Sequence, residues 1–313
     1  MRPAARLSGV TLPQPGIFAL GTRSHYHLEF DLLPGAAPRA LVEVLAALRE
    51  PRKTTGGINL VVGLAPRVWE AVAPDELPPG AADFEPVVGP DGFTMPATQH
   101  DAWIWLAGSD ADVVFDVARS AVGALAGLAS LGHEVAGFTY LDSRDLTGFI
   151  DGTENPPLDV AAAAALVPEG MPGAGSSVAI VQRWLHDLDA FHALPVAEQE
   201  AAIGRTRADS IELDDDTKPA DAHISRVVIE DEQGEELEIL RRSIPVGGMR
   251  DHGLEFVAFS ADQSVLVRML HRMVGTDDGV RDHLTRFTTP LTGAFYVTPS
   301  VEALKAFAPD NED

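Results

Sequence analysis

Three segments of the chain repeat one local plan, in which a short apolar strand is followed by a polar break and then by an amphipathic helix. The first runs from HYHLEFDL at residues 25–32 to RALVEVLAALRE at 39–50, and the second from DAWIWLAG at 101–108 into the stretch 109–132. The third begins with LEFVAF at 254–259. Units of this kind bury their apolar sides against one another, so the chain is expected to form sheets covered by helices.

The spacing of apolar residues predicts the helix in each unit. In the first helix they recur at i, i+3, i+4 and i+7, at Leu41, Val44, Leu45 and Leu48. In the third helix one side is formed by Val265, Leu266, Met269, Leu270 and Met273. Pro38 suits the first turn of the first helix, and Gly275 closes the third. Ser109 with Asp112 resembles a capping box for the second helix, and Gly132 is expected to end it.

The remaining strand-like stretches resemble hairpins. They are SSVAIVQRWLHDL at 176–188 and SRVVIEDEQGEELEILRRSIP at 225–245, with a charged turn in the second. Strand–helix units mixed with hairpins predict an α+β fold with antiparallel sheets. The string Leu-Glu-Phe occurs at 28–30 and at 254–256, once in each half, which suggests an internal duplication.

Chain length also predicts two parts. At 313 residues the chain exceeds the size at which a single core stops growing. The stretch NPPLDVAAAAALVPEGMPGAG at 155–175 is rich in Pro, Gly and Ala, as expected of a connection between two parts. We therefore divide the chain into an N-terminal half at 1–152 and a C-terminal half at 153–313, the second carrying the functional site.

The charge balance restricts the possible partners. There are 47 acidic against 23 basic residues, a formal net charge of −24, which argues against nucleic-acid and anionic-membrane partners. Cysteine is absent, which excludes disulfides, thiolate metal ligands and cysteine nucleophiles. The N-terminal sequence MRPAARLSGVTLPQPG has no continuous apolar stretch, so we expect no secretory signal and a cytoplasmic protein.

The string GFIDGTENP at 148–156 places Asp151 after two apolar residues and directly before a glycine. Asp-Gly is a common turn dipeptide, so a purely structural role is one interpretation. A second is an aspartyl-phosphate nucleophile, although the usual companion residues of that chemistry are missing. A third is a buried acid or base, which would require a cationic partner nearby.

Two further residues are candidates for such a site. His223 precedes the predicted hairpin at 225–245, and its alternatives are an ordinary core or surface histidine and an axial ligand of haem iron. Strand alternation places Arg241 and Ser243 on one face with apolar neighbours, where a guanidinium would need an anionic partner. The alternative for Arg241 is a snorkelling arginine at a strand end.

Taken together, these strings resemble the dye-decolourising peroxidases, and in particular their bacterial, cytoplasmic B-type branch. GFIDGTENP is similar to the GxxDG signature of that family. EQEAAIGRTR at 198–207, AHISRV around His223, LRRSIP at 240–245 and FTTPLTGAFYVTPS at 287–300 follow in the expected order. The resemblance covers most of the chain. It implies two fused ferredoxin-like halves, of the dimeric α+β barrel type.

The resemblance also implies roles for individual residues. His223 would be the proximal ligand of the iron of haem b, and Asp282 would accept a hydrogen bond from it. Asp151 and Arg241 would be the distal catalytic groups, and Arg205 would pair with a haem propionate. The chain departs from the family at Ser243, where asparagine is usual; the shorter side chain leaves room for a water.

The function implied is a haem peroxidase that uses hydrogen peroxide to oxidise dyes or other small aromatic electron donors, in a homo-oligomer. The alternative is a non-enzymatic protein that binds haem or releases its iron. Bulky donors would have to pass electrons through aromatic residues, of which the chain has Trp69, Trp103, Trp105, Trp184, Tyr26, Tyr140 and Tyr296. We expect Trp103 and Trp105 to serve core packing. A distal aspartate, with a reference pKa of about 3.9, predicts an acidic optimum for dye oxidation.

Overall fold

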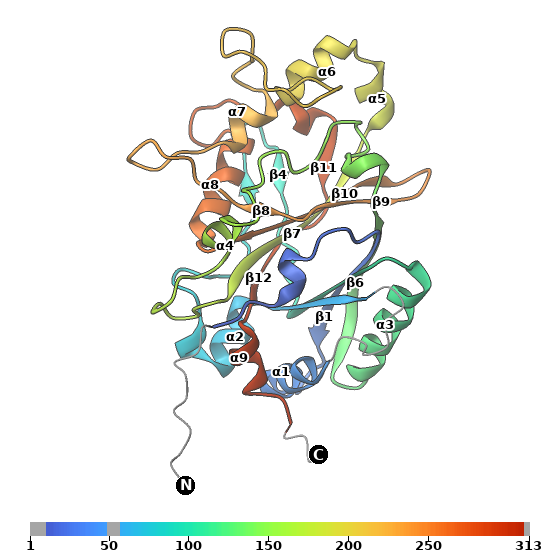
Figure 1. Ribbon diagram of the computed structural model, residues 1–313, viewed down its shortest axis with the longest axis vertical. Helices are drawn as coiled ribbons and strands as arrows, with labels where there is room; N and C mark the ends of the chain where they lie inside the picture. The colour runs from blue at the N-terminus through green and yellow to red at the C-terminus, as the bar shows by residue number, and fades with distance from the viewer. Residues whose placement is uncertain (1–10, 49–56, 310–313) are drawn as a thin grey trace.

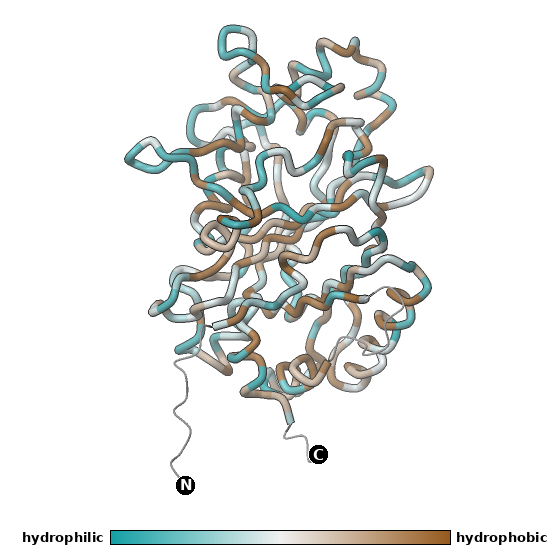
Figure 2. The backbone as a smooth tube through the Cα atoms, in the orientation of Figure 1, coloured by the Kyte–Doolittle hydropathy of each residue, from teal (hydrophilic) through white to brown (hydrophobic). Residues whose placement is uncertain are grey.

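The structure is a computed structural model that describes residues 11–48 and 57–309 (Figure 1). The first ten residues, on which part of the expectation about a secretory signal rests, lie outside this range. Hydrophobic segments follow the central strands, and hydrophilic ones gather at protruding loops (Figure 2). Among the described helices, none has both the length and the apolar character needed to cross a bilayer.

The N-terminal half forms a four-strand layer in the order β2-β5-β1-β6. Its main elements are β1 (Ser24–Leu32), α1 (Pro38–Ala47), β2 (Asn59–Leu64), β5 (Ala102–Gly108), α3 (Ala111–Ala124) and β6 (Ala129–Phe138). Shorter elements are η1 (Pro15–Phe18), α2 (Pro66–Val72), η2 (Pro74–Glu76), β3 (Val87–Val88), β4 (Thr94–Met95) and η3 (Leu141–Ser143). One hydrophobic cluster joins α1, α2 and α3 to this layer.

The C-terminal half repeats the arrangement with strands in the order β12-β7-β10-β9. Its main elements are β7 (Ser177–His186), β9 (Ile244–Gly247), β10 (His252–Ser260), α8 (Gln263–Val274) and β12 (Ala294–Thr298). Between and beside them lie α4 (Ala161–Ala165), α5 (Leu188–Ala193), α6 (Val196–Ile203), α7 (His223–Val227), β8 (Leu240–Arg241), η4 (His283–Arg286), β11 (Thr288–Pro290) and α9 (Val301–Lys305).

The two layers join into one antiparallel barrel. β12 pairs with β2, β6 pairs with β9, and β10 pairs with β7 from Gly253–Leu185 to Ser260–Val178. The closed ring is therefore β7-β12-β2-β5-β1-β6-β9-β10. This confirms the predicted α+β fold with antiparallel sheets, and both halves show the strand order of a ferredoxin-like unit. The division between residues 152 and 153 stays a prediction.

The predicted helices form, with two differences at their ends. Leu41 and Leu45 are buried in α1 as expected, with Pro38 at its first position. α8 ends at Gly275, which adopts the left-handed conformation expected of a C-terminal glycine. The prediction for α3 was wrong at both ends, because Asp110 is its N-cap without a side-chain hydrogen bond, and Gly132 lies within β6.

The predicted hairpin at 225–245 is largely absent. His223 opens the short helix α7, and the chain that follows is irregular apart from a bridge between Glu230 and Glu236. Regular pairing resumes only in β8 and β9, both of which pair with the same edge of β10. The apolar residues of this segment cover one side of the C-terminal layer instead of pairing with each other, since Ile229 and Ile239 belong to its core.

The inside of the barrel combines large aromatic side chains with buried acids. Trp103, Trp105 and Tyr296 are at most 1% exposed, so the core position expected for the two tryptophans is confirmed. Glu255 on β10 is fully buried, and neither carboxylate oxygen has a hydrogen-bond partner among the described residues. Burial raises the pKa of Glu255 well above its ordinary value of 4.5, and Glu29 adds to the shift.

This burial makes the effect of Glu255→Gln on stability depend on pH. The folded protein retains a proton on Glu255 that the unfolded chain releases above the ordinary pKa, so the stability of the wild type falls relative to the variant as pH rises. The gap in unfolding free energy should widen by about 1.4 kcal/mol per pH unit above pH ~5. Denaturant titrations at several pH values measure it, and Glu232→Gln, on an exposed loop, is the control. A gap independent of pH would contradict the prediction.

Candidate active site

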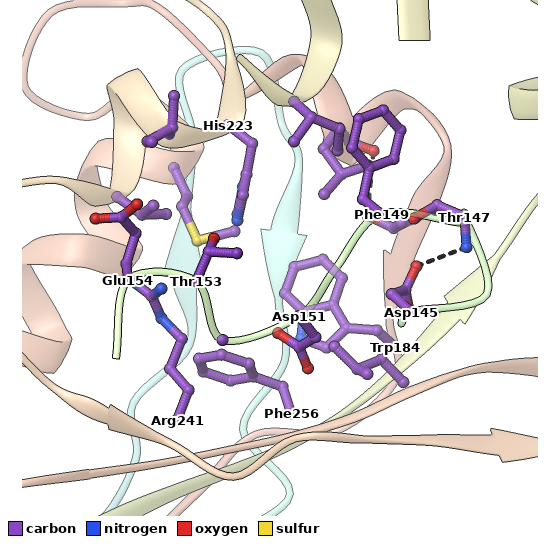
Figure 3. Close-up of a pocket in the computed structure, with 18 of the residues that line it drawn as sticks. Asp145, Thr147, Phe149, Asp151, Thr153, Glu154, Trp184, His223, Arg241 and Phe256 are labelled. Carbon is purple, nitrogen blue, oxygen red and sulfur yellow. Dashed lines mark hydrogen bonds between the residues drawn. The ribbon is translucent and has the colours of Figure 1, made fainter. Parts of the chain in front are cut away.

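A deep hollow lies on the outer face of the C-terminal layer. Its volume is about 1310 Å³ including its open mouth, and most of its walls are apolar. The floor is built from alternate residues of two paired strands, Ile180, Gln182, Trp184 and His186 of β7 with Leu254 and Phe256 of β10. Helices α7 and α8 form one side, and the loop at 145–154 closes another (Figure 3). The outward faces of β7 and β10 therefore create the site.

His223 projects from the first residue of α7 into the hollow (Figure 3). Its Nδ1 lies 2.6 Å from Oδ2 of Asp282, whose side chain is 0% exposed, whereas the side chain of His223 is 32% exposed. An imidazole that donates Nδ1–H to a buried carboxylate keeps a fixed ring orientation and a free Nε2 lone pair. Such a ring is suited to bind a metal from one side of the hollow.

Asp282 is held firmly where it meets the histidine. Its second oxygen, Oδ1, accepts a hydrogen bond from the backbone N–H of Leu284 at 2.9 Å and so caps the short helix η4. Its own N–H donates to the carbonyl of Met273 at the end of α8. The His223–Asp282 pair thus connects α7 with the segment that follows α8.

Asp151 lies in the loop across the hollow from His223 (Figure 3). Its N–H donates to the carbonyl of Ser143, and Gly152 after it has φ +76°, a conformation that favours glycine. Burial is the main reason that the pKa of Asp151 rises from 3.8 to about 6, with the charge of Asp145 adding to the shift. Arg241 opposes that rise without cancelling it. The carboxylate can therefore gain and lose a proton near neutral pH.

Asp145 is a second carboxylate in the wall of the hollow, and sequence reasoning did not find it. It lies 3.1 Å from Nε2 of His186 and accepts a hydrogen bond from the N–H of Thr147 at 2.8 Å (Figure 3). Although burial opposes ionisation, these contacts lower the pKa of Asp145 to about 2. It therefore remains negative beside Asp151 over the working range of most proteins.

Arg241, at the end of β8, lines the same hollow as Asp151 and His223. Its backbone is fixed by Asn155, whose side-chain oxygen accepts from the N–H of Arg241 at 2.7 Å and whose amide donates to its carbonyl at 2.9 Å. No hydrogen bond or ion pair of its guanidinium is present among the described residues. Asn155, near the end of the string at 148–156, thus holds the backbone of Arg241.

Ser243 does not lie in the hollow. It lines a second, more polar cavity of about 770 Å³, including its mouth, which shares Asp151, Gly152 and Arg241 with the first. The hydroxyl oxygen of Ser243 accepts a long hydrogen bond, 3.4 Å, from the N–H of Val257. Arg241 and Ser243 thus share the second cavity, as strand alternation predicted, but only Arg241 also lines the hollow that contains His223.

Arg205 lies at the rim of the hollow and is paired with acids of the protein itself. It forms an ion pair with Glu154 and a longer one with Glu212 at 3.5 Å, and its Nη1 donates to the carbonyl of Ser210. Its Nε is buried and without a partner among the described residues. One donor thus remains available for an anionic group in the hollow, and Glu154 is a further residue that sequence reasoning missed.

The arrangement fits haem better than a small polar ligand. The apolar walls suit a large flat ring, the free Nε2 of His223 suits an axial metal ligand, and the unpartnered Nε of Arg205 suits a carboxylate at the rim. The structure brings together in one hollow four of the predicted residues, His223, Asp151, Arg241 and Arg205. It places Asp282 behind His223, in contact with its Nδ1.

Comparison with known proteins gives two family matches that together span most of the chain. Residues 30–139 match the family described as Dyp-type peroxidase, N-terminal, and residues 142–303 match Dyp-type peroxidase, C-terminal. The chain is 37% identical over 303 residues to a dye-decolorizing peroxidase of Rhodococcus erythropolis, which covers 94% of this chain and 88% of the relative. It is 35% identical over 257 residues to one of Mycobacterium tuberculosis, which covers 81% of this chain and 76% of the relative.

Solved structures agree with these matches. A dyp-type peroxidase protein from Shewanella oneidensis superposes with a TM-score of 0.89 at 32% identity, covering 96% of this chain and all of that one. A variant of DypB from Rhodococcus jostii in complex with heme gives a TM-score of 0.89 at 33% identity, covering 95% of this chain and 99% of that one.

The charge of Asp145 should have a measurable effect on the pKa of Asp151. Asp145→Asn removes the negative charge that helps to raise the pKa of Asp151, so that pKa should fall below about 6. Infrared difference spectra of protein with isotope-labelled aspartate can follow the titration, with Asp151→Asn to identify its band. Asp189→Asn, on the exposed side of α5, should leave the titration unchanged. An unchanged or higher pKa in Asp145→Asn would show that the coupling is absent.

Proposed function

The chain belongs to the Dyp-type peroxidase family and is a haem-dependent peroxidase, and we propose that His223 binds the haem iron while Asp151 and Arg241 activate hydrogen peroxide. The observation that carries this proposal is the geometry of the hollow. An imidazole tied to a fully buried carboxylate lies on one side, and a carboxylate and a guanidinium line another part of the same hollow.

His223 and Arg205 would hold haem b in the hollow. Nε2 of His223 would bind the iron, with Asp282 keeping the ring in place and increasing its basicity. The buried Nε of Arg205 would donate to a propionate, while Nη2 of the same guanidinium keeps its ion pair with Glu154. When bound, haem b supplies an iron that exchanges electrons with peroxide and with the reductant.

Asp151 would move the proton that peroxide cleavage requires. Its carboxylate takes the proton from one oxygen of hydrogen peroxide and returns it to the other, so that water can leave. A base must be ionised to accept a proton, and the pKa of about 6 provides an ionised carboxylate at neutral pH. The same pKa makes the protonated form accessible enough to return the proton.

Arg241 would stabilise the negative charge that develops as the O–O bond breaks. Asn155 anchors its backbone, and the charges of Arg241 and Asp151 act on each other, so the guanidinium would be held in the hollow as a cation. Ser243 would act from the second cavity, where its hydroxyl and a water could connect Asp151 with solvent. In this arrangement Asp151 and Arg241 perform the chemistry, and Ser243 supports proton exchange.

The proposed partners are hydrogen peroxide and a small aromatic reductant. The net charge of −24 supports the absence of a nucleic-acid or anionic-membrane partner. We further infer a cytoplasmic homo-oligomer, on the resemblance to the B-type branch of the family.

The role of His223 can be tested by the absorption of haem. His223→Ala should lose the Soret band, or shift it, because the hollow then lacks the free Nε2 that would bind the iron. Asp282→Asn should retain haem but change the spectrum and lower the ligand strength of the imidazole. His252→Ala is the control, because His252 is the first residue of β10 and does not line the hollow. A native spectrum in His223→Ala would refute the assignment.

The pKa of Asp151 predicts the acid limit of peroxide activation. The rate of reaction with hydrogen peroxide should fall as pH drops through about 6, since the carboxylate becomes protonated. This limit lies above the pKa of a reference aspartate, because burial outweighs the effect of Arg241. The acidic optimum expected for dye oxidation stays a prediction. Asp151→Asn should lower the rate by about 10²–10⁴-fold and remove the fall in rate below pH ~6. Stopped-flow mixing with peroxide measures both effects. If the rate of Asp151→Asn still falls as pH drops through about 6, another group causes that fall.

A further inference from the structure

We propose that Tyr296 and Glu29, inside the barrel, form a one-electron store for the peroxidase, connected to the haem side by the stacked rings of Trp105 and Trp103. The proposal rests on the proposed function, because the haem site must first be oxidised by peroxide. It concerns the barrel interior, which β7 and β10 separate from the haem hollow, and the core cluster there that contains Trp103, Trp105 and Tyr296.

Five rings form a continuous stack inside the barrel. The centroid distances are 5.9 Å from His25 to Trp105, 5.7 Å from Trp105 to His27, 5.8 Å from His27 to Trp103 and 5.9 Å from Trp103 to Tyr296. All four pairs are nearly parallel, with interplanar angles between 11° and 19°. Neighbouring π systems at this spacing offer short steps for the movement of an electron.

Both ends of the stack have a proton acceptor. The hydroxyl of Tyr296 donates to Oε1 of Glu29 at 2.5 Å, and Nε1 of Trp105 donates to Nδ1 of His25 at 3.1 Å. Oxidation makes a phenol or an indole strongly acidic, so a base in contact favours the loss of an electron. Burial raises the pKa of Glu29 to about 7, which matches a carboxylate that exchanges a proton near neutral pH.

Packing alone does not explain the composition of this core. An interior built for stability would use apolar side chains, but both ring nitrogens of His27 and Nε1 of Trp103 are buried without partners among the described residues. The stack also requires a glycine. A Cβ at Gly63 would lie 2.8 Å from Cβ of Tyr296 and 3.0 Å from the ring of Trp103, so a larger residue would push the two rings apart.

One strand separates the stack from the haem hollow. In β10, Phe256 faces the hollow, whereas Phe259 faces the barrel with its ring 6.2 Å from Trp105 and 6.3 Å from Trp103. Arg242 follows Arg241 in the chain, and its guanidinium lies 5.0 Å from the centroid of the Trp105 ring. The oxidised site and the stack are therefore neighbours across a single layer of backbone.

The step balances as a transfer of one electron and one proton. Tyr296 gives one electron through Trp103 and Trp105 to the haem site that peroxide has oxidised. Its O–H bond breaks at the same time, and the proton passes to Oε1 of Glu29. A later electron from the aromatic reductant restores the phenol, and Glu29 returns the proton. His25 lines the second cavity, so the reductant can deliver this electron at the Trp105 end.

The test is rapid-freeze electron paramagnetic resonance of the haem-loaded protein after mixing with a stoichiometric amount of hydrogen peroxide. A tyrosyl signal should form and should narrow in protein grown with ring-deuterated tyrosine. It should be lost in Tyr296→Phe and reduced in Glu29→Gln and Trp103→Phe. Tyr26→Phe, Tyr140→Phe and Trp69→Phe are the matched controls and should retain the signal.

The outcomes separate this proposal from the peroxidase assignment. The proposal is overturned if the signal persists in Tyr296→Phe, if Tyr26→Phe or Tyr140→Phe removes it, or if peroxide changes the haem spectrum without any tyrosyl signal. A haem spectrum that does not respond to peroxide would instead refute the proposed activity, and the store with it. The haem spectrum and thermal melting of each variant show whether it is folded. If Tyr296→Phe does not fold, a reduced signal in Glu29→Gln or Trp103→Phe supports the proposal, and an unchanged signal in both overturns it.

Discussion

The pairing of β7 with β10 is the contact on which the functional architecture depends. It closes the barrel and gives one layer two distinct faces, because successive side chains of a strand point to opposite sides. Leu254 and Phe256 face the hollow, while Glu255 and Val257 face the barrel interior. A shift of one residue in this register would exchange the two sets and place a glutamate in the apolar floor of the haem site.

Burial controls the chemistry of the carboxylates in different ways. Asp145 stays ionised because His186 and the N–H of Thr147 stabilise its charge. Asp151 has weaker support from its surroundings, so desolvation and the neighbouring charge of Asp145 raise its pKa to about 6. Glu255 has no partner among the described residues, and burial raises its pKa well above the ordinary value of 4.5. The low-dielectric interior thus provides an ionised group, a titrating group and a neutral group.

Local signals predicted some elements well and failed where tertiary contacts decide. The periodicity of α1 and α8 was sufficient, since most of the residues that recur at helical spacing are buried, among them Leu41 and Leu45 in α1 and Leu266 and Met269 in α8. The segment at 225–245 has strand-like composition, yet it covers the C-terminal core as an irregular chain that starts from α7. Alternation correctly placed Ser243 and Arg241 at one cavity, but it did not show that only Arg241 also reaches the hollow of His223.

The amino-acid sequence by itself determined the α+β class, the repeated halves and the candidate residues, because these follow from periodicity and from short strings such as GFIDGTENP. Only the tertiary structure decided which residues meet. Asp282 reaches His223 across 59 positions of the chain, and Asn155 reaches Arg241 across 86. Closure of the barrel also assembled the stack from Trp105 to Tyr296 and buried Glu29 beside it. Contacts between distant strands, and the pKa values that burial imposes, depend on packing that no local pattern encodes.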